Sequence, residues 1–205
     1  MADTHAQVSR LGSCLWGGHH GLCFNDKTRL GLMSTPLTLP LFDADTLKFL
    51  QQVFQWVRRG DAASLAPMLA AGLPSKLRNE QGDSLLLLAA YHGRPAVVRL
   101  LLDASADPDV VNDRGQTALG AAAFKGDLEV VQLLLDHGAQ PDSPPGGRTA
   151  LMFAAMFNRL EMMTVLRQRG ADPWLHDGGG LTALRAAEKM GAQEAAQLLK
   201  AWASG

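Results

Sequence analysis

Two cysteines and two histidines lie close together near the amino end of the 205-residue chain, and these residue types bind soft metals. Cys14, His19, His20 and Cys23 follow the spacing C-x4-HH-x2-C. Structural zinc sites use closer pairs of ligands, of the kind C-x2-C with H-x3-H, and this spacing matches none of them. We therefore expect no metal site and no cofactor.

Acid–base catalysis would need a histidine beside a carboxylate, a nucleophile, and a site that excludes water. Two pairs could supply the first requirement: His92 with Asp113, and His176 with Asp177. No nucleophile recurs beside either pair, and no glycine-rich phosphate loop follows a strand, since no strand is evident. The sequence Arg59-Gly60-Asp61 matches an adhesion tripeptide, but we assign Gly60 to a turn between two helices. We expect no catalytic residues and a protein that is not an enzyme.

The charge and hydropathy of the chain exclude several classes of partner. Nineteen basic residues against twenty acidic ones give a formal net charge of −1, which provides no electrostatic footprint for nucleic acid or an anionic membrane. No apolar run approaches the roughly 18 residues that cross a bilayer. Residues 1–30 lack the basic start and apolar stretch of a secretory signal. We expect a cytoplasmic protein that binds neither nucleic acid nor membrane.

The chain divides near residue 42. Residues 1–42 mix Gly, His, Ser and Pro with apolar residues that follow neither a helical nor a strand period. We interpret this segment as a disordered or non-native amino-terminal extension, with Met33 as an alternative translation start. Residues 43–205 form the folded domain, and they contain no cysteine, so the fold needs no oxidising compartment.

Helical signals begin at Asp43, and Asp45 is a candidate N-cap for the first helix of this domain. Leu47, Leu50, Phe54 and Val57 then fall on one face of a helix. The apolar stripe indicates that this face packs against the next element.

From here the sequence repeats. Gly60, Gly93, Gly126, Asn158 and Gly191 are spaced by 33, 33, 32 and 33 residues. A serine or threonine precedes each of the last four by nine residues, which is about two and a half helical turns. Glycine, or asparagine as its best substitute, suits a left-handed turn between antiparallel helices. The period predicts an array of helix pairs.

The repeated segments SLLLLAAYHG, TALGAAAFKG, TALMFAAMFN and TALRAAEKMG, each followed by a second apolar helix, resemble the ankyrin repeat. The motif histidine is replaced by Leu87, Gly120, Met152 and Arg185. The resemblance implies an all-α solenoid of about five stacked helix-turn-helix units with short hairpin loops. The units are 45–78, 79–111, 112–143, 144–176 and 177–203.

The resemblance also implies a concave face on which residues before each turn glycine and at the loop tips meet a partner protein. In this chain the candidate partner-binding residues are Arg58, Arg59, Tyr91, His92, Arg114, Phe124, Lys125, Arg148, Phe157 and Met190. Aromatic, methionine and arginine side chains are typical of binding hot spots. The alternative is that the aromatic rings pack sideways between repeats.

Three other features are open to interpretation. The loop PDSPPGG, residues 141–147, is one residue short; it either shapes the site or is a tolerated deletion. Trp174 and Trp202 are expected to be packing residues.

These features predict a monomeric, non-catalytic protein–protein interaction module. The composition resembles that of compact bacterial ankyrin proteins, which implies an accessory role to a stress enzyme such as catalase. A host-directed or enzyme-inhibiting module is the alternative.

Overall fold

The computed structural model describes residues 44–142 and 144–204. Within these ranges the chain forms ten α-helices and no β-strand, and none of the helices has the length and apolarity of a membrane span. Our predictions for the extension over residues 1–42, the alternative start at Met33 and the group Cys14, His19, His20 and Cys23 lie outside the described residues.

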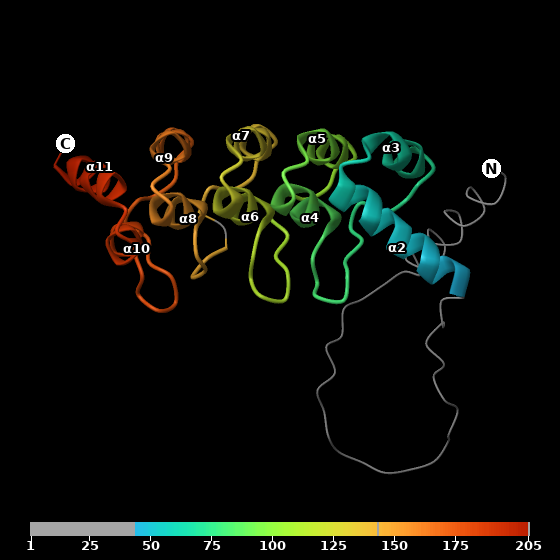
Figure 1. The fold of residues 1–205 in the computed structure, drawn as a ribbon, viewed down its shortest axis with the longest axis horizontal. Helices are drawn as coiled ribbons and strands as arrows, with labels where there is room; N and C mark the ends of the chain where they lie inside the picture. Colours follow the sequence, from blue (N-terminus) through green and yellow to red (C-terminus); the bar gives the residue numbers. More distant parts are fainter. Residues whose placement is uncertain (1–43, 143, 205) are drawn as a thin grey trace, which may run out of the picture.

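The helices form five pairs that stand side by side in one row (Figure 1). The first helix of each pair, here called an inner helix, is α2 (Ala44–Arg59), α4 (Leu85–Tyr91), α6 (Ala118–Lys125), α8 (Ala150–Met156) or α10 (Ala183–Met190). The second, here called an outer helix, is α3 (Ala62–Ala70), α5 (Pro95–Asp103), α7 (Leu128–Asp136), α9 (Leu160–Gln168) or α11 (Gln193–Ala203). The prediction of an all-α solenoid of five units is confirmed.

Each inner helix after the first begins at the hydroxyl that recurs in the sequence. The Ser84 hydroxyl accepts a hydrogen bond from the Leu87 amide at 3.1 Å, and the Thr117 hydroxyl accepts one from the Gly120 amide at the same distance. Thr149 and Thr182 cap α8 and α10 in the same way. A side-chain cap of this kind satisfies an amide that the first helical turn leaves unpaired.

The turn residues have the left-handed backbone that the sequence predicted, with φ of +83° at Gly126 and +56° at Asn158. The next repeat covers these turns. Arg159 donates to the Lys125 carbonyl at 3.1 Å, and the side chain of Asn158 accepts from the Ala195 amide at 2.9 Å at the start of α11. Neighbouring repeats are therefore joined by polar contacts as well as by packing.

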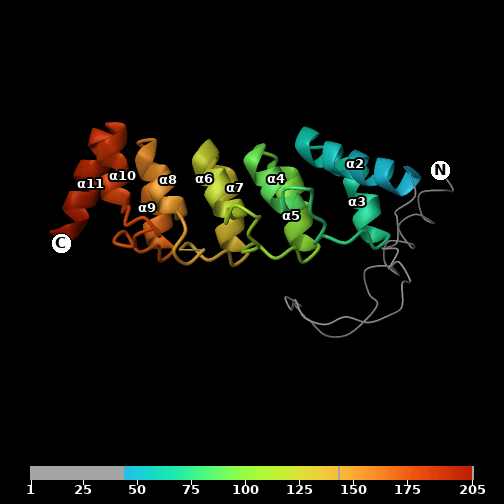
Figure 2. The same ribbon diagram turned by 90° about the horizontal axis from the view of Figure 1, so that it is seen from below.

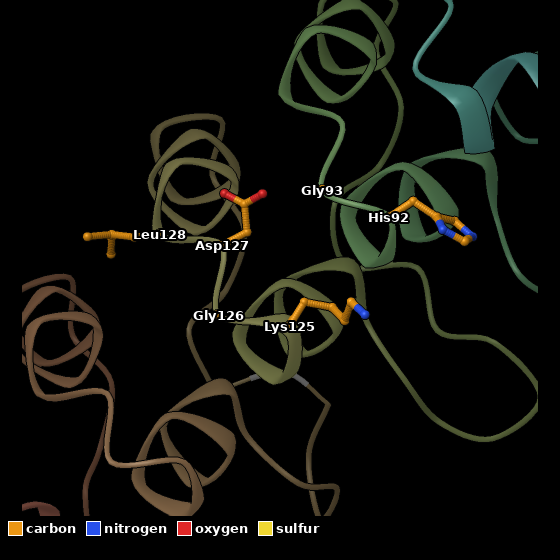
Figure 3. Close-up of a pocket in the computed structure, with 6 residues that line it drawn as sticks. All are labelled: His92, Gly93, Lys125, Gly126, Asp127 and Leu128. Atoms are coloured by element: carbon orange, nitrogen blue, oxygen red, sulfur yellow. The ribbon is translucent and has the colours of Figure 1, made fainter.

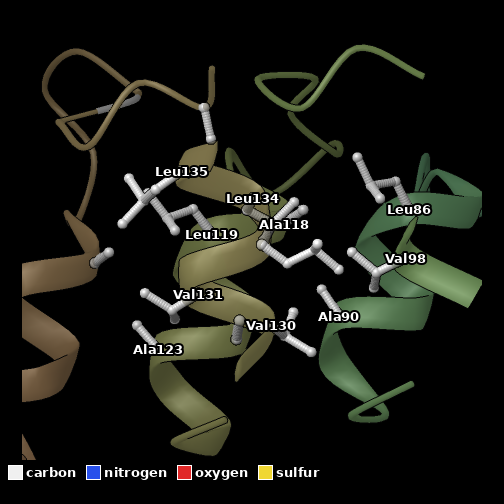
Figure 4. Packing of buried hydrophobic residues seen from close by; sticks show 14 of the residues in the cluster. Leu86, Ala90, Val98, Ala118, Leu119, Ala123, Val130, Val131, Leu134 and Leu135 are labelled. Carbon is white, nitrogen blue, oxygen red and sulfur yellow. The ribbon is translucent and has the colours of Figure 1, made fainter. Parts of the chain in front are cut away.

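The core runs along the whole row between inner and outer helices. Ala90 and Ala123 of the inner helices leave room for Val98 and Val131 of the outer helices (Figure 4), and all four residues are buried. Small side chains on the inner helices let successive repeats approach closely. Since one repeat has no interior of its own, stacking is what buries these side chains.

Two predictions about α2 need correction, one on its N-cap and one on a residue of its apolar face. The helix begins at Ala44, so Asp45 lies in its first turn instead of capping it. Its buried residues are Phe49, Val53 and Val57. Of the predicted stripe, Val57 is buried, Leu50 and Phe54 pack partly buried against the core, and Leu47 is exposed. Because α2 begins the row in the described part of the chain, its buried residues, four apart, face α3 and α4, and no repeat covers its other side.

The two tryptophans differ in environment. Trp202 is partly buried against the core, and the Arg167 guanidinium lies 4.6 Å from its ring centroid. Trp174 is 48% exposed on the loop before α10, so the prediction that it is a packing residue is wrong.

Candidate partner-binding groove

A groove of about 980 Å³ lies between inner helices and loop tips, and its lining residues come from four repeats. We call it the concave groove. The inner helices α4, α6 and α8 lie side by side in both views (Figures 1 and 2), and the loops that precede α6, α8 and α10 project beyond them in Figure 1. The helices form the floor of the concave groove, and the loop tips form one wall.

Asparagine or aspartate side chains close three of the loop tips. Asn79 accepts hydrogen bonds from the amides of Gln81 and Asp83. Asn112 and Asp177 each accept from two backbone amides in the same arrangement. These bonds give the wall a fixed shape, since each tip holds its own backbone.

The loop before α8 departs from this arrangement because proline replaces the capping side chain. Pro144 occupies the equivalent position, and its carbonyl accepts from the Gly147 amide at 3.0 Å. The next tip pairs with this loop through the Gly178 amide and the Gly146 carbonyl at 2.8 Å. Both loops line the concave groove. Of the two interpretations of PDSPPGG, this geometry favours the one in which the loop shapes the site.

Part of the floor is formed by a glycine that stands in place of the motif histidine. A methyl group added at Gly120 would meet the Phe153 ring at 3.6 Å and the Thr117 hydroxyl at 3.4 Å, which are ordinary contact distances. The equivalent positions in the neighbouring repeats hold Leu87 and Met152, both buried. Gly120 therefore leaves an apolar recess beside Phe153, which we call the Gly120 recess.

The predicted aromatic side chains reach solvent at the edge of the floor. Tyr91 and Phe124 are 40% and 42% exposed, and both line the concave groove. Phe124 packs edge-to-face against Phe153, with ring centroids 5.9 Å apart, and against Phe157 at 5.4 Å. These rings hold one another in place while their outer faces stay open to solvent.

A second, shallower hollow of about 440 Å³ lies beside the turns of the second and third repeats (Figure 3). His92 and Lys125 line it, and the Lys125 ammonium lies 5.0 Å from the Tyr91 ring centroid. Burial lowers the pKa of His92 below 6.5, and the nearby cations Arg58, Arg94 and Lys125 lower it further. Cations therefore surround the imidazole of His92.

The structure brings together half of the ten predicted site residues. Those that line the concave groove are Tyr91, His92, Arg114, Phe124 and Arg148. Lys125 and Phe157 contact Tyr91 and Phe124 from outside it. The remaining three, Arg58, Arg59 and Met190, lie on α2 and α10 and do not line the groove.

Two acidic residues that were not among the ten predicted site residues line the groove. The buried Asp83 accepts from Asn112 at 2.7 Å and lies 3.6 Å from the Arg114 guanidinium. Asp177 lies 3.5 Å from Arg148. The 33-residue recurrence of Asn or Asp at the loop tips was the signal that could have found this network.

The hydrogen bonds of Asp177 bear on the acid–base pairs considered from the sequence. Amides of Leu181 and Gly179, together with Arg148, lower the pKa of its carboxyl below 3.8. Asp177 thus serves its own loop and a groove arginine instead of orienting His176 as a base. For His92, the charges that perturb the imidazole are all cationic.

Comparison with known proteins agrees with this architecture. A family model described as "Ankyrin repeats (3 copies)" matches residues 55–145 and again 86–177. An ankyrin repeat protein of Pseudomonas aeruginosa is 48% identical over 61 residues, which are 30% of this chain and 36% of that protein. The match thus spans about a third of the length of the curated relative. The two matches of the family model together cover residues 55–177, which are more than half of this chain. The chain therefore belongs to the ankyrin-repeat family.

Proposed function

We propose that the protein is a non-catalytic interaction module and that its concave groove binds a segment of a partner protein. Ankyrin repeats are protein–protein interaction modules. The observation that carries the proposal for this groove is the exposure of Tyr91 and Phe124 beside a largely apolar floor. Large aromatic side chains bordered by arginine are the residues that dominate binding energy at protein interfaces.

The competing interpretation, in which the rings only pack between repeats, explains part of the arrangement. Phe124 does contact Phe153 and Phe157. Packing alone gives no reason for leaving the ring 42% exposed, because the core beneath it is already filled by alanine and leucine. A partner that covers the exposed face would add apolar burial that the free protein lacks.

We also propose that the protein is a monomer and that it is located in the cytoplasm. The outer side of α2 carries the exposed glutamines Gln51, Gln52 and Gln55, which suit the solvent-facing end of a row. Both cysteines of the chain precede residue 44, so the repeats need no disulfide and fit a reducing compartment.

The test is to capture partners on the full chain and on two variants. The double variant Tyr91→Ala/Phe124→Ala should keep its helical circular dichroism and lose the captured partner, because both changes remove exposed groove side chains. The matched control is Trp174→Ala, which removes a ring of similar exposure outside the groove and should leave capture unchanged. Equal capture by all three proteins would refute the proposal.

Mass spectrometry of the captured material identifies the partner. The first candidate to test is a stress enzyme such as catalase, with this protein as its accessory protein. A host-cell protein, or an enzyme that is inhibited on binding, is the alternative. Addition of the purified module to the captured enzyme distinguishes an accessory from an inhibitor by the direction of the change in activity.

A further inference from the structure

The charges of the concave groove are arranged with the carboxylates inside and the guanidinium groups outside. Asp83 and Asp177, the acidic residues that line it, are bound by loop amides or amide side chains and have little exposed surface. Arg114 and Arg148, their partners, are 66% and 53% exposed. The charged groups that are exposed to a ligand in the groove are therefore mainly the arginines, although the lining is formally neutral.

Each of these arginines keeps donors free. Arg114 approaches Asp83 through one nitrogen at 3.6 Å, and Arg148 approaches Asp177 through one nitrogen at 3.5 Å. A guanidinium has five N–H donors in a planar fork that matches a carboxylate. The two arginines stand on the tips of adjacent loops, and Lys125 stands beyond Tyr91 on the opposite side of the floor.

Between these cations lies the Gly120 recess, walled by the rings of Phe153 and Phe124. Gly120 lines the groove, and the equivalent positions of the adjacent repeats hold the larger residues Leu87 and Met152. The groove, whose volume is about 980 Å³, is lined there by Gly120, Phe124 and Phe153, and one large apolar side chain of a ligand can pack against these residues.

We propose that the occupant of the concave groove is an acidic segment of a partner protein, with one large apolar side chain in the Gly120 recess and flanking carboxylates on Arg114 and Arg148. This proposal rests on the proposed function, since it names the chemistry of the partner at the same site. Charge complementarity selects the segment, and the recess sets its register.

Selection of peptides on the full-length protein tests the proposal even while the partner is unidentified. The probe is a phage-displayed library of randomised linear peptides, and the affinities of the enriched peptides are measured by fluorescence polarisation. We expect peptides of net negative charge that carry one large apolar residue. Their affinity should fall as salt rises, because partly exposed charge pairs are screened.

Variants of the groove then locate the bound peptide. Arg114→Gln and Arg148→Gln should each weaken binding about tenfold, as expected for the loss of one charge-assisted hydrogen bond. The control Arg99→Gln, on the outer helix α5, should change nothing. Gly120→Met should abolish binding by filling the recess. Gly120→Ala should preserve it, because a methyl group fits there at ordinary contact distances.

The outcomes separate this proposal from the proposed function. Neutral or basic peptides, or acidic peptides indifferent to Arg114→Gln and Arg148→Gln, would overturn the acidic occupant. If their binding still needed Phe124, the groove would remain a protein-binding site. A library that yields no binder also overturns the proposal, whereas partner capture that depends on Tyr91 and Phe124 would keep the proposed function. The two arginine variants carry the test even if Gly120→Met fails to fold.

Discussion

Replacing Gly126 by alanine should destabilise the array through its neighbour as well as through its own backbone. Gly126 has a φ of +83°, and a methyl group there would fall on the guanidinium of Arg159 from the next repeat. The left-handed backbone costs an alanine about 1–2 kcal/mol. Displacing Arg159 also breaks its bond to the Lys125 carbonyl, which is worth about 1–2 kcal/mol for a charged donor.

Gly191 provides the matched control. It is the equivalent turn residue of the last repeat, with a φ of +72°, and nothing lies within 4 Å of an added methyl group. Gly191→Ala should therefore cost only the backbone term of about 1–2 kcal/mol. Gly126→Ala should cost about 2–4 kcal/mol in total.

Urea unfolding followed by circular dichroism measures both losses. A double-mutant cycle isolates the contact between repeats: in the Arg159→Ala background, Gly126→Ala should lose only as much stability as Gly191→Ala does. Two results would refute the claim that Arg159 of one repeat stabilises the turn of the repeat before it. One is an equal loss of unfolding free energy for Gly126→Ala and Gly191→Ala in the wild-type background. The other is a loss for Gly126→Ala that stays the same in the Arg159→Ala background.

Two further predictions concern single side chains. Asn158→Gly keeps the left-handed turn but removes the hydrogen bonds to Ala195 and Glu194. It should therefore lower the free energy of unfolding by about 1 kcal/mol. Asn158→Ala adds backbone strain and should lower the free energy of unfolding by about 2–3 kcal/mol. Urea unfolding checks both, and an Asn158→Gly variant more stable than the wild type would contradict the capping role. The pKa of His92 lies below 6.5, so the unfolded chain binds this proton more readily and stability falls as pH drops below 6.5. An NMR titration should find this low pKa and a rise towards 6.5 in Lys125→Gln, and a value at or above 6.5 in the wild type would contradict it.

The sequence predicted the repeating features because each recurs in a fixed register. The hydroxyls at Ser84 and Thr117 and the turn residues Gly126 and Asn158 act through their own backbone, so their roles follow from residue type and spacing. The register of α2 was not predictable in this way. It depends on which side of the helix meets a neighbour, and the sequence shows two overlapping apolar stripes there.

The site was predicted only in part for a similar reason. Tyr91 and Phe124 were found because they precede the turn glycines. The Gly120 recess depends on the ring of Phe153 in the next repeat, and the inward orientation of Asp83 depends on Asn112. Both are contacts between repeats, which no pattern within one repeat reports.

The claim that the concave groove holds the partner is tested most directly by amide hydrogen exchange of the full chain, alone and with its captured partner. We predict slower exchange in α4, α6 and the loops that carry Arg114 and Arg148, with the outer helices α5, α7 and α9 unchanged. Protection confined to the outer helices, with the groove exchanging as in the free protein, would contradict the account.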